Sequence, residues 1–240
     1  MYGYGLGYGY GFGYGIDPMY LMLVVASLAL GLVTQSYINS TYRKWSKVRS
    51  DGDTGAAVAR RMLDALGCSQ VGIKSVTGTL TDHYDPRDNN LYLSRDNLSG
   101  GSVASVAVAC HEAGHAAQRA QGYAMMRART ALVPVVNFTQ QTWMLIFLAG
   151  IFLNIAGLAT LAIVFFSFSV LFQLVTLPVE FDASRRAVAY IQESGMSATQ
   201  VRGARAVLTA AALTYVAAAL TSILQLLYLL YRTGGRNSRD

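Results

Sequence analysis

The chain has 240 residues, of which 53% are hydrophobic and only 13% are charged, and its formal net charge is +6 at pH 7. Soluble domains are seldom this apolar, so the composition argues against an ordinary soluble protein and favours a chain with several membrane spans. The Lys and Arg residues cluster beside the apolar runs, where orientation in a membrane accounts for them, and nucleic-acid binding is therefore not expected.

The N-terminal part combines a low-complexity tail with a first apolar run. Residues 1–16 include a repeat of glycine alternating with aromatic residues or leucine, a composition that orders poorly and predicts a disordered tail. Residues 17–38 follow, uncharged from Met19 to Tyr37 and about as long as the ~20 residues that one helix needs to cross a bilayer. Basic residues come after this run, so we expect an uncleaved transmembrane helix with the chain after Ser40 in the cytoplasm.

Residues 39–136 contain the longest stretch without a membrane signal and predict a small cytoplasmic α+β domain. Apolar residues at helical spacing predict a helix that begins at Asp53 or Thr54 and ends at Leu66. Three short segments have strand character: residues 71–76, 79–84 and 91–93. Ser102 can cap a further helix over residues 102–121.

The helix predicted over residues 102–121 carries an HExxH array. His111 and His115 lie one turn apart on one face, so both imidazoles can hold one zinc ion while Glu112 is a potential general base. Cys110 points away from this face on a regular helix, and we expect it to be a buried small side chain rather than a ligand. Two histidines are not sufficient, because a catalytic zinc needs a third protein ligand and an open position for water.

The second half of the chain predicts three more membrane helices. As one helix, the uncharged stretch from Trp143 to Leu177 would be ~52 Å long, against ~30 Å for a hydrocarbon core. A helical hairpin over residues 137–177, bending around residues 154–157 and ending at Pro178, fits better. The rest of the chain divides into a cytoplasmic segment, a fourth membrane helix and a tail, over residues 178–205, 206–231 and 232–240.

Glu180, directly after the predicted hairpin, is the expected third zinc ligand. The chain has only two other glutamates, Glu112 and Glu193, and on a helix Asp182 would point about 200° away from Glu180. The histidines and Glu180 can share an ion only if an even number of membrane crossings separates them. The predicted hairpin supplies two crossings, and basic residues at both of its ends place these ends on the cytoplasmic side.

Five segments together resemble the YugP-type neutral zinc metallopeptidases of bacterial membranes. They are HEAGHA at 111–116, DHYDPR at 82–87, LVPVVNF at 132–138, LPVEFDASRR at 177–186 and AALTYVAAA at 211–219. The resemblance covers about Tyr42 to Tyr231 and implies a membrane-embedded zinc peptidase of the bacterial inner membrane, with His111 and His115 as ligands and Glu112 as catalyst. The segment from Glu180 is also similar to the Glu-x-x-Ala-Asp motif of membrane gluzincins. Ser184 stands where their aspartate does, which leaves Asp182 and Ser184 as alternatives for the residue that orients a ligand.

The expected fold is therefore mainly α: a four-span membrane protein with a small α+β zincin-like cytoplasmic portion that carries HExxH on a helix. The expected function is hydrolysis of a peptide or membrane-protein substrate near the cytoplasmic surface, with one Zn²⁺ per chain and with Glu112 taking a proton from the zinc-bound water. His83 and Tyr84 are candidate donors to the oxyanion, the alternative being that they are ordinary loop or strand residues. A strand edge there could also hold an extended substrate. The alternative is a non-hydrolytic membrane scaffold with a structural zinc.

Overall fold

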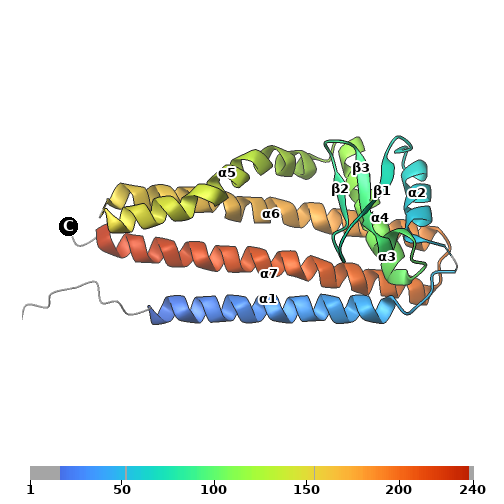
Figure 1. The fold of residues 1–240 in the computed structure, drawn as a ribbon, viewed down its shortest axis with the longest axis horizontal. Coiled ribbons are helices and arrows are strands. Elements are labelled where there is room, and N and C mark those ends of the chain that lie inside the picture. Colours follow the sequence, from blue (N-terminus) through green and yellow to red (C-terminus); the bar gives the residue numbers. More distant parts are fainter. Residues whose placement is uncertain (1–16, 52, 154, 238–240) are drawn as a thin grey trace, which may run out of the picture.

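The computed structural model describes residues 17–51, 53–153 and 155–237 (Figure 1). Its long helices are α1 (Pro18–Trp45), α5 (Ala124–Phe152), α6 (Ala156–Glu193) and α7 (Ala198–Asn237). The shorter elements are α2 (Gly55–Ala65), β1 (Gly72–Val76), β2 (His83–Asp85), β3 (Asn90–Ser94), α3 (Arg95–Leu98) and α4 (Val103–Ala120). The tail predicted over residues 1–16 lies outside the described residues.

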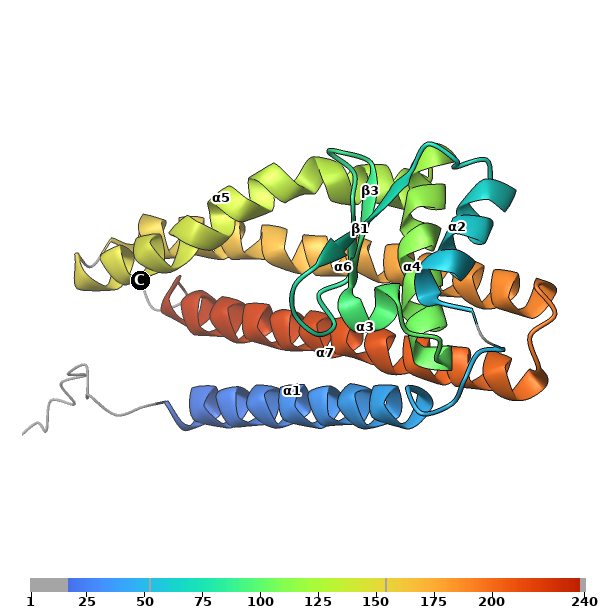
Figure 2. The same cartoon turned by 45° about the vertical axis from the view of Figure 1, so that its right-hand side comes forward.

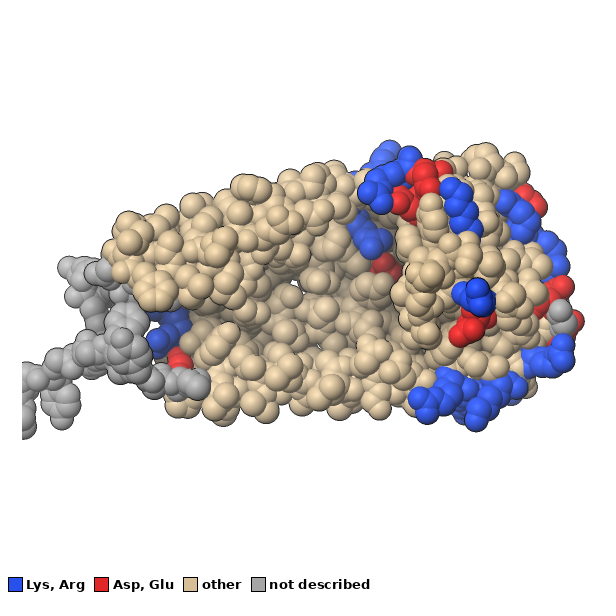
Figure 3. Space-filling view, in the orientation of Figure 1, with Lys and Arg blue, Asp and Glu red and all other residues tan. Residues whose placement is uncertain are grey.

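Among the described residues, four helices are long and apolar enough to cross a membrane: Pro18–Trp45, Ala124–Gly150, Gly157–Glu193 and Ala198–Thr233. They lie side by side, and the short elements cover them at one end (Figure 1). Charged side chains gather at that end, while the long helices show an uncharged surface on the same face (Figure 3). The other end carries a pair between Asp17 and Arg232, with 3.6 Å between Oδ2 and Nη1. The mainly helical fold with four apolar helices is thus confirmed.

All four of these helices are longer than the sequence predicts, and two of them continue through a proline. We expected the second arm of the hairpin to end at Pro178, but α6 continues through this proline to Glu193. An internal proline removes one backbone hydrogen bond, and a helix tolerates it where the flanking turns are held by packing. Val179 and Ala183 are fully buried just after Pro178, and they supply this packing. The first arm likewise begins earlier than predicted, because α5 starts at Ala124 and passes through Pro134.

The strands form a sheet in the order β1-β3-β2, so β2 is an edge strand. The neighbouring pairs differ in direction: β1 runs parallel to β3, while β2 runs antiparallel to β3. The side chains of Leu91 and Leu93 on β3 are fully buried in a core that includes Met62 of α2 and Val106 of α4. The sheet therefore packs its apolar side chains toward α4.

Helix α4 is the central element of this end of the molecule. It contacts α2, β2, β3, α6 and α7, and in the turned view it lies beside α2 and in front of α6 (Figure 2). The Ser102 hydroxyl caps its N-terminus by accepting a hydrogen bond from the Ser105 N–H at 3.1 Å. Gly122 adopts a φ of 65° just after its C-terminus, a left-handed conformation that glycine reaches without steric cost. The capped helix holds residues 111–115 at a fixed position against α6.

Candidate metal centre

His111 and His115 of α4 and Glu180 of α6 converge on one point, and we call these three residues the metal group. Their potential ligand atoms all lie within 4.8 Å of one another. The Glu180 Oε2 lies 3.2 Å from the Nε2 of His111 and 3.5 Å from the Nε2 of His115. The two imidazole rings meet edge to face, with 4.7 Å between their centroids. Residues 69 positions apart in the chain are thus brought into direct contact.

The metal group fits a zinc ion. Ligand atoms bound ~2.1 Å from a tetrahedral zinc stand about 3.4 Å from one another, close to the two nitrogen–oxygen separations given above. Two imidazoles and one carboxylate are also a known donor set of catalytic zinc, and three protein ligands leave the fourth position for water or substrate. The carboxylate is only 2% exposed, so the charge of a bound cation would compensate a buried anion.

Gln118 fixes which nitrogen of His115 faces the metal position. Its amide nitrogen donates to the Val179 carbonyl at 2.8 Å and to the Asp182 Oδ2 at 3.0 Å, which uses both amide hydrogens. The amide oxygen must therefore face His115, whose Nδ1 lies 3.0 Å away. The Nδ1 of His115 carries the proton and donates it to this oxygen, so Nε2 presents a lone pair to the metal position.

Both residues that the sequence left as alternatives beside Glu180 reach the histidines, by different routes. The Ser184 hydroxyl lies 3.1 Å from the Nδ1 of His111 and contacts this ligand directly. Asp182 acts through Gln118 and is itself paired with Arg185 and Arg186. Each histidine therefore has its own partner: Ser184 of α6 contacts His111, and Gln118 of α4, itself held by α6, contacts His115. These contacts align both rings toward Glu180.

The close approach of α4 to α6 depends on small residues. A Cβ atom placed on Gly114 would lie 2.8 Å from the Ala183 carbonyl oxygen, closer than such contacts occur. The absence of a side chain at Gly114 allows α6 to lie directly on α4 and brings Glu180 to the histidines. The second oxygen of Glu180, Oε1, lies 3.5 Å from the Arg129 guanidinium of α5, which leaves Oε2 for the metal position.

Glu112 lies beside the metal group without being part of it. Its side chain lines a cavity of about 260 Å³ that also contains His111, and we call this the catalytic cavity. Its carboxylate accepts a hydrogen bond from the main chain of Tyr84 on the edge strand β2. Burial raises the pKa of Glu112 to about 7. A carboxyl group with such a pKa can accept and return a proton near neutral pH.

Comparisons with known proteins agree with this arrangement. Residues 20–234 match the model of a family described as "Putative neutral zinc metallopeptidase". The chain belongs to this family. It is also 44% identical over 211 residues to a Bacillus subtilis (strain 168) protein named "Putative membrane protease YugP". The matched region covers 87% of this chain and 94% of that protein. No solved structure matches the chain. The resemblance that the sequence motifs indicated is thereby confirmed at the level of the family, and membership of a zinc peptidase family implies zinc.

The structure does not bring the His83 and Tyr84 side chains to the metal group. The His83 ring is exposed, lies 2.9 Å from the Thr81 carbonyl through Nδ1, and stacks on Tyr92. The Tyr84 hydroxyl donates to Asn89 at 2.6 Å. Adjacent residues of a strand point to opposite sides, and here neither side is the metal position; only the Tyr84 backbone reaches the site.

Sequence reasoning missed three residues at this centre: Gln118, Arg129 and Tyr215. Tyr215 of α7 lines the catalytic cavity, and its hydroxyl lies at the Glu180 carboxylate. Gln118 follows His115 by three positions on one helix face, a spacing that could have indicated it. Tyr215 falls within the segment 211–219, but no local spacing links this segment to the HExxH helix.

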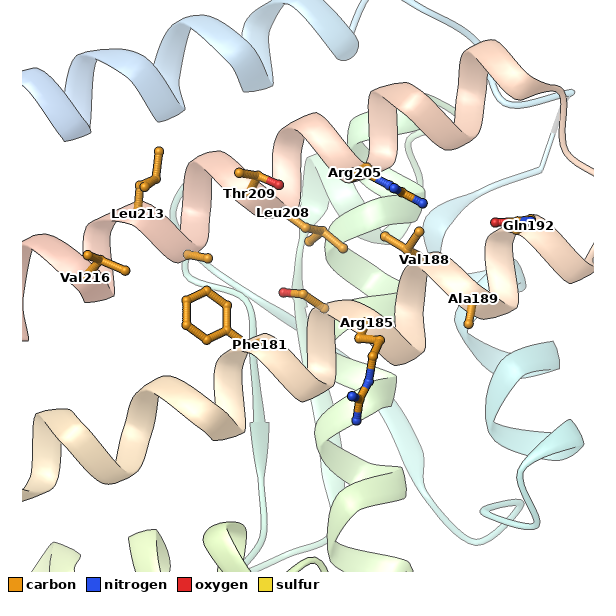
Figure 4. A pocket seen from close by; sticks show the side chains of 12 residues that line it. Phe181, Arg185, Val188, Ala189, Gln192, Arg205, Leu208, Thr209, Leu213 and Val216 are labelled. Carbon is orange, nitrogen blue, oxygen red and sulfur yellow. The ribbon is translucent and has the colours of Figure 1, made fainter.

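Cys110 and an apolar cavity between α6 and α7 are not part of the metal centre. Cys110 is fully buried in the core, and burial raises the pKa of its thiol to about 12. The apolar cavity, about 470 Å³, lies between α6 and α7 and is lined by residues such as Phe181, Leu213 and Val216 (Figure 4). It reaches the centre at Ser184, and neither Glu112 nor a residue of the metal group lines it.

Proposed function

We propose that this protein is a membrane-embedded zinc metalloendopeptidase with Glu112 as its general base. The observation that carries the proposal is a buried carboxylate that lines an open cavity next to the metal group and is not one of its ligands. A structural zinc site needs four protein ligands and no such carboxylate, whereas a hydrolytic site needs three ligands and a base. One zinc per chain would be held by His111, His115 and Glu180.

The chain's own residues supply the proton transfers and the orientation. A bound zinc lowers the pKa of its water to ~7 and polarises a carbonyl group. Glu112 accepts the proton from the attacking water and then delivers it to the leaving amine, for which its raised pKa is suited. Gln118 and Ser184 keep the two imidazoles aligned during the reaction.

Tyr215 is the proposed donor to the oxyanion that develops on the substrate carbonyl. Its hydroxyl lies in the catalytic cavity beside Glu180, on the α7 wall. Preorganised donors of this kind stabilise the charge of the transition state more than that of the substrate. The edge strand β2, whose backbone contacts Glu112, could hold an extended substrate by strand addition.

The proposed location is the inner membrane of a bacterium, with the metal centre facing the cytoplasm. Both ends of the α5–α6 hairpin lie at the end of the molecule where charged residues gather, which supports placing the two halves of the site on one side (Figures 1 and 3). The residues after α1 are basic, and the positive-inside rule assigns such segments to the cytoplasm.

The substitution Glu112→Gln tests the proposal, with Glu193→Gln as the matched control. Glu193 is an exposed residue at the end of α6 and does not line the catalytic cavity. We expect reconstituted wild type and E193Q to cleave members of a library of unstructured peptides and E112Q to be slower by about 10²–10⁴-fold, because the general base is lost. All three proteins should bind one zinc.

Two results would count against this function. Undiminished cleavage by E112Q would exclude Glu112 as the base. Absence of cleavage by wild type, together with zinc-dependent folding that His111→Ala abolishes, would favour the scaffold with a structural zinc.

A further inference from the structure

Two of the candidate membrane helices, α1 and α7, line the catalytic cavity together with α4 and with Leu80 and Asp82 before β2. Glu112 and His111 form its inner wall on α4, and its outer walls are built from α1 and α7. Gln35 and Ile38 line the α1 wall, and Thr214 and Tyr215 line the α7 wall. Any substrate that reaches Glu112 from this side of the cavity must pass between α1 and α7.

The depth of this side of the cavity can be measured along the helices. The Asp17–Arg232 pair marks the end of the helices away from the strands. A hydrocarbon core of ~30 Å corresponds to about 20 helical residues. Counted from Pro18 this length reaches Tyr37, and counted back from Tyr231 it reaches Ala212. Gln35 and Thr214 therefore lie at the inner border of the apolar layer, not in the aqueous part of the protein.

A second cavity continues from the first toward the middle of the membrane helices. It has a volume of about 360 Å³, lies between α1 and α7, and shares Gln35 and Thr214 with the catalytic cavity. Its deep end is at Ser27 and Ser222, and the eight helical steps from Ser27 to Gln35 correspond to ~12 Å along α1. We call it the inner cavity. The two cavities together form one path from the depth of Ser27 to Glu112.

The walls of the inner cavity are small and polar. They include Gly31, Thr34 and Thr221 in addition to the two serines. Small residues between membrane helices commonly serve close packing, but close packing would leave no free volume between α1 and α7. Polar groups beside a cavity at membrane depth instead offer hydrogen bonds to a chain that is not helical, and such a chain is tolerated only there.

A hydrogen-bond network joins two residues that line the catalytic cavity, Tyr42 and Asp82. The Tyr42 hydroxyl of α1 donates to the Asn97 amide oxygen at 2.6 Å, and the Asn97 amide nitrogen donates to the Asp82 carboxylate at 2.8 Å. Asp82 also accepts from the Ser94 N–H at 2.7 Å. Tyr42 and Asp82 both line the catalytic cavity, so this network fixes α1 relative to the strands.

We infer that the substrate is a membrane-inserted protein segment that reaches Glu112 laterally, as an extended chain between α1 and α7. This inference rests on the proposed peptidase function and names its substrate class. An extended chain advances ~3.3 Å per residue, so the ~12 Å inner cavity holds about four residues. The catalytic cavity adds to this length, so the scissile bond is more than about four unwound residues from the helical part of the substrate's span.

The substitution Gly31→Leu tests the path by filling the inner cavity. A Cβ atom on Gly31 meets no other heavy atom within 4 Å, so the larger side chain can be accommodated without disturbing α1. Gly157→Leu is the matched control, because it has the same free space but lies at the start of α6, away from both cavities. Two substrates carry one cleavage sequence: a soluble peptide, and the same peptide joined to a single membrane span by a linker of more than about four residues, in the same vesicles.

We expect G31L to slow cleavage of the anchored substrate about tenfold or more and to leave the soluble peptide within about twofold of wild type. G157L should change neither rate. Equal slowing of both substrates, or no effect on the anchored one, would overturn the lateral path.

Cross-linking gives a readout that does not require catalysis. In the Glu112→Gln background, Gly31→Cys should cross-link to a cysteine placed in the span of the anchored substrate. Val33→Cys, on the lipid-exposed side of α1 at 66% exposure, should not cross-link. The native Cys68 and Cys110 are fully buried and do not interfere. Equal cross-linking at 31 and 33, or none at 31, would refute the path even if peptidase activity is established. Cross-linking at 31 without cleavage by wild type would refute the peptidase function and still support a lateral path for the substrate.

Discussion

Replacing Gln118 by methionine should weaken zinc binding although Gln118 does not touch the metal position. The change keeps the length of a fully buried side chain but removes its three hydrogen bonds, to His115, the Val179 carbonyl and Asp182. His115 then loses the acceptor that fixes its Nδ1 proton, so its Nε2 no longer presents a lone pair in every molecule. Asp182 keeps its partners Arg185 and Arg186 and remains compensated.

The expected magnitude follows from these contacts. Loss of the partner that orients a metal-binding histidine typically costs about 10–100-fold in metal affinity, which is about 1.4–2.7 kcal/mol. The buried Val179 carbonyl loses its hydrogen bond from the Gln118 side chain, which costs about 1–3 kcal/mol of stability in the metal-free protein as well. The variant should therefore be less stable without zinc and should gain less stability when zinc is added.

Competition with a chelator of known affinity measures the zinc Kd, and thermal unfolding with and without zinc measures the stability. Gln121→Met is the control, because Gln121 is exposed one turn later on the same end of α4 and contacts Arg186 only at the surface. A zinc Kd for Q118M within about twofold of wild type would refute the role assigned to Gln118.

Two further predictions concern the packing of the centre and its chemistry. Gly114→Ala should push α6 away from α4 by about half an ångström, weaken zinc binding by about tenfold or more and lower the free energy of unfolding by about 1–3 kcal/mol. Gly31→Ala is the control, because a Cβ atom there has free space and should change neither quantity. An unchanged zinc Kd in a titration of G114A would disprove the need for close approach. Tyr215→Phe should lower kcat by about 10²–10³-fold while the protein still binds zinc. Two controls should keep the wild-type kcat: Tyr228→Phe, at the other end of α7, and His83→Ala. A wild-type kcat for Y215F in steady-state kinetics would exclude Tyr215 as the donor to the oxyanion.

The sequence predicted correctly the features that depend on local composition and spacing alone, which are the apolar helices and the placement of the two histidines. The uncharged runs predicted four apolar helices because burying a charge in hydrocarbon is costly, and the helical period put His111 and His115 on one face. The bounds were less accurate at Pro178, because a local signal for ending a helix was outweighed by the packing of α6 on α4. The expectation for His83 and Tyr84 rested on their position near polar residues, and strand geometry directs both side chains elsewhere.

What the sequence alone determined was the half of the site that lies within one helical turn, together with the class of the fold and, by its motifs, the family. The sequence also indicated Glu180 as the third ligand, and the structure brings it to the two histidines. Only the tertiary structure decided which partner orients each histidine, and that α1 and α7 line the cavity beside Glu112. The reason is physical. Contacts within a helix follow from its repeat, whereas contacts between helices 60 to 200 residues apart depend on how closely their backbones approach, and here that approach is set by Gly114 against Ala183.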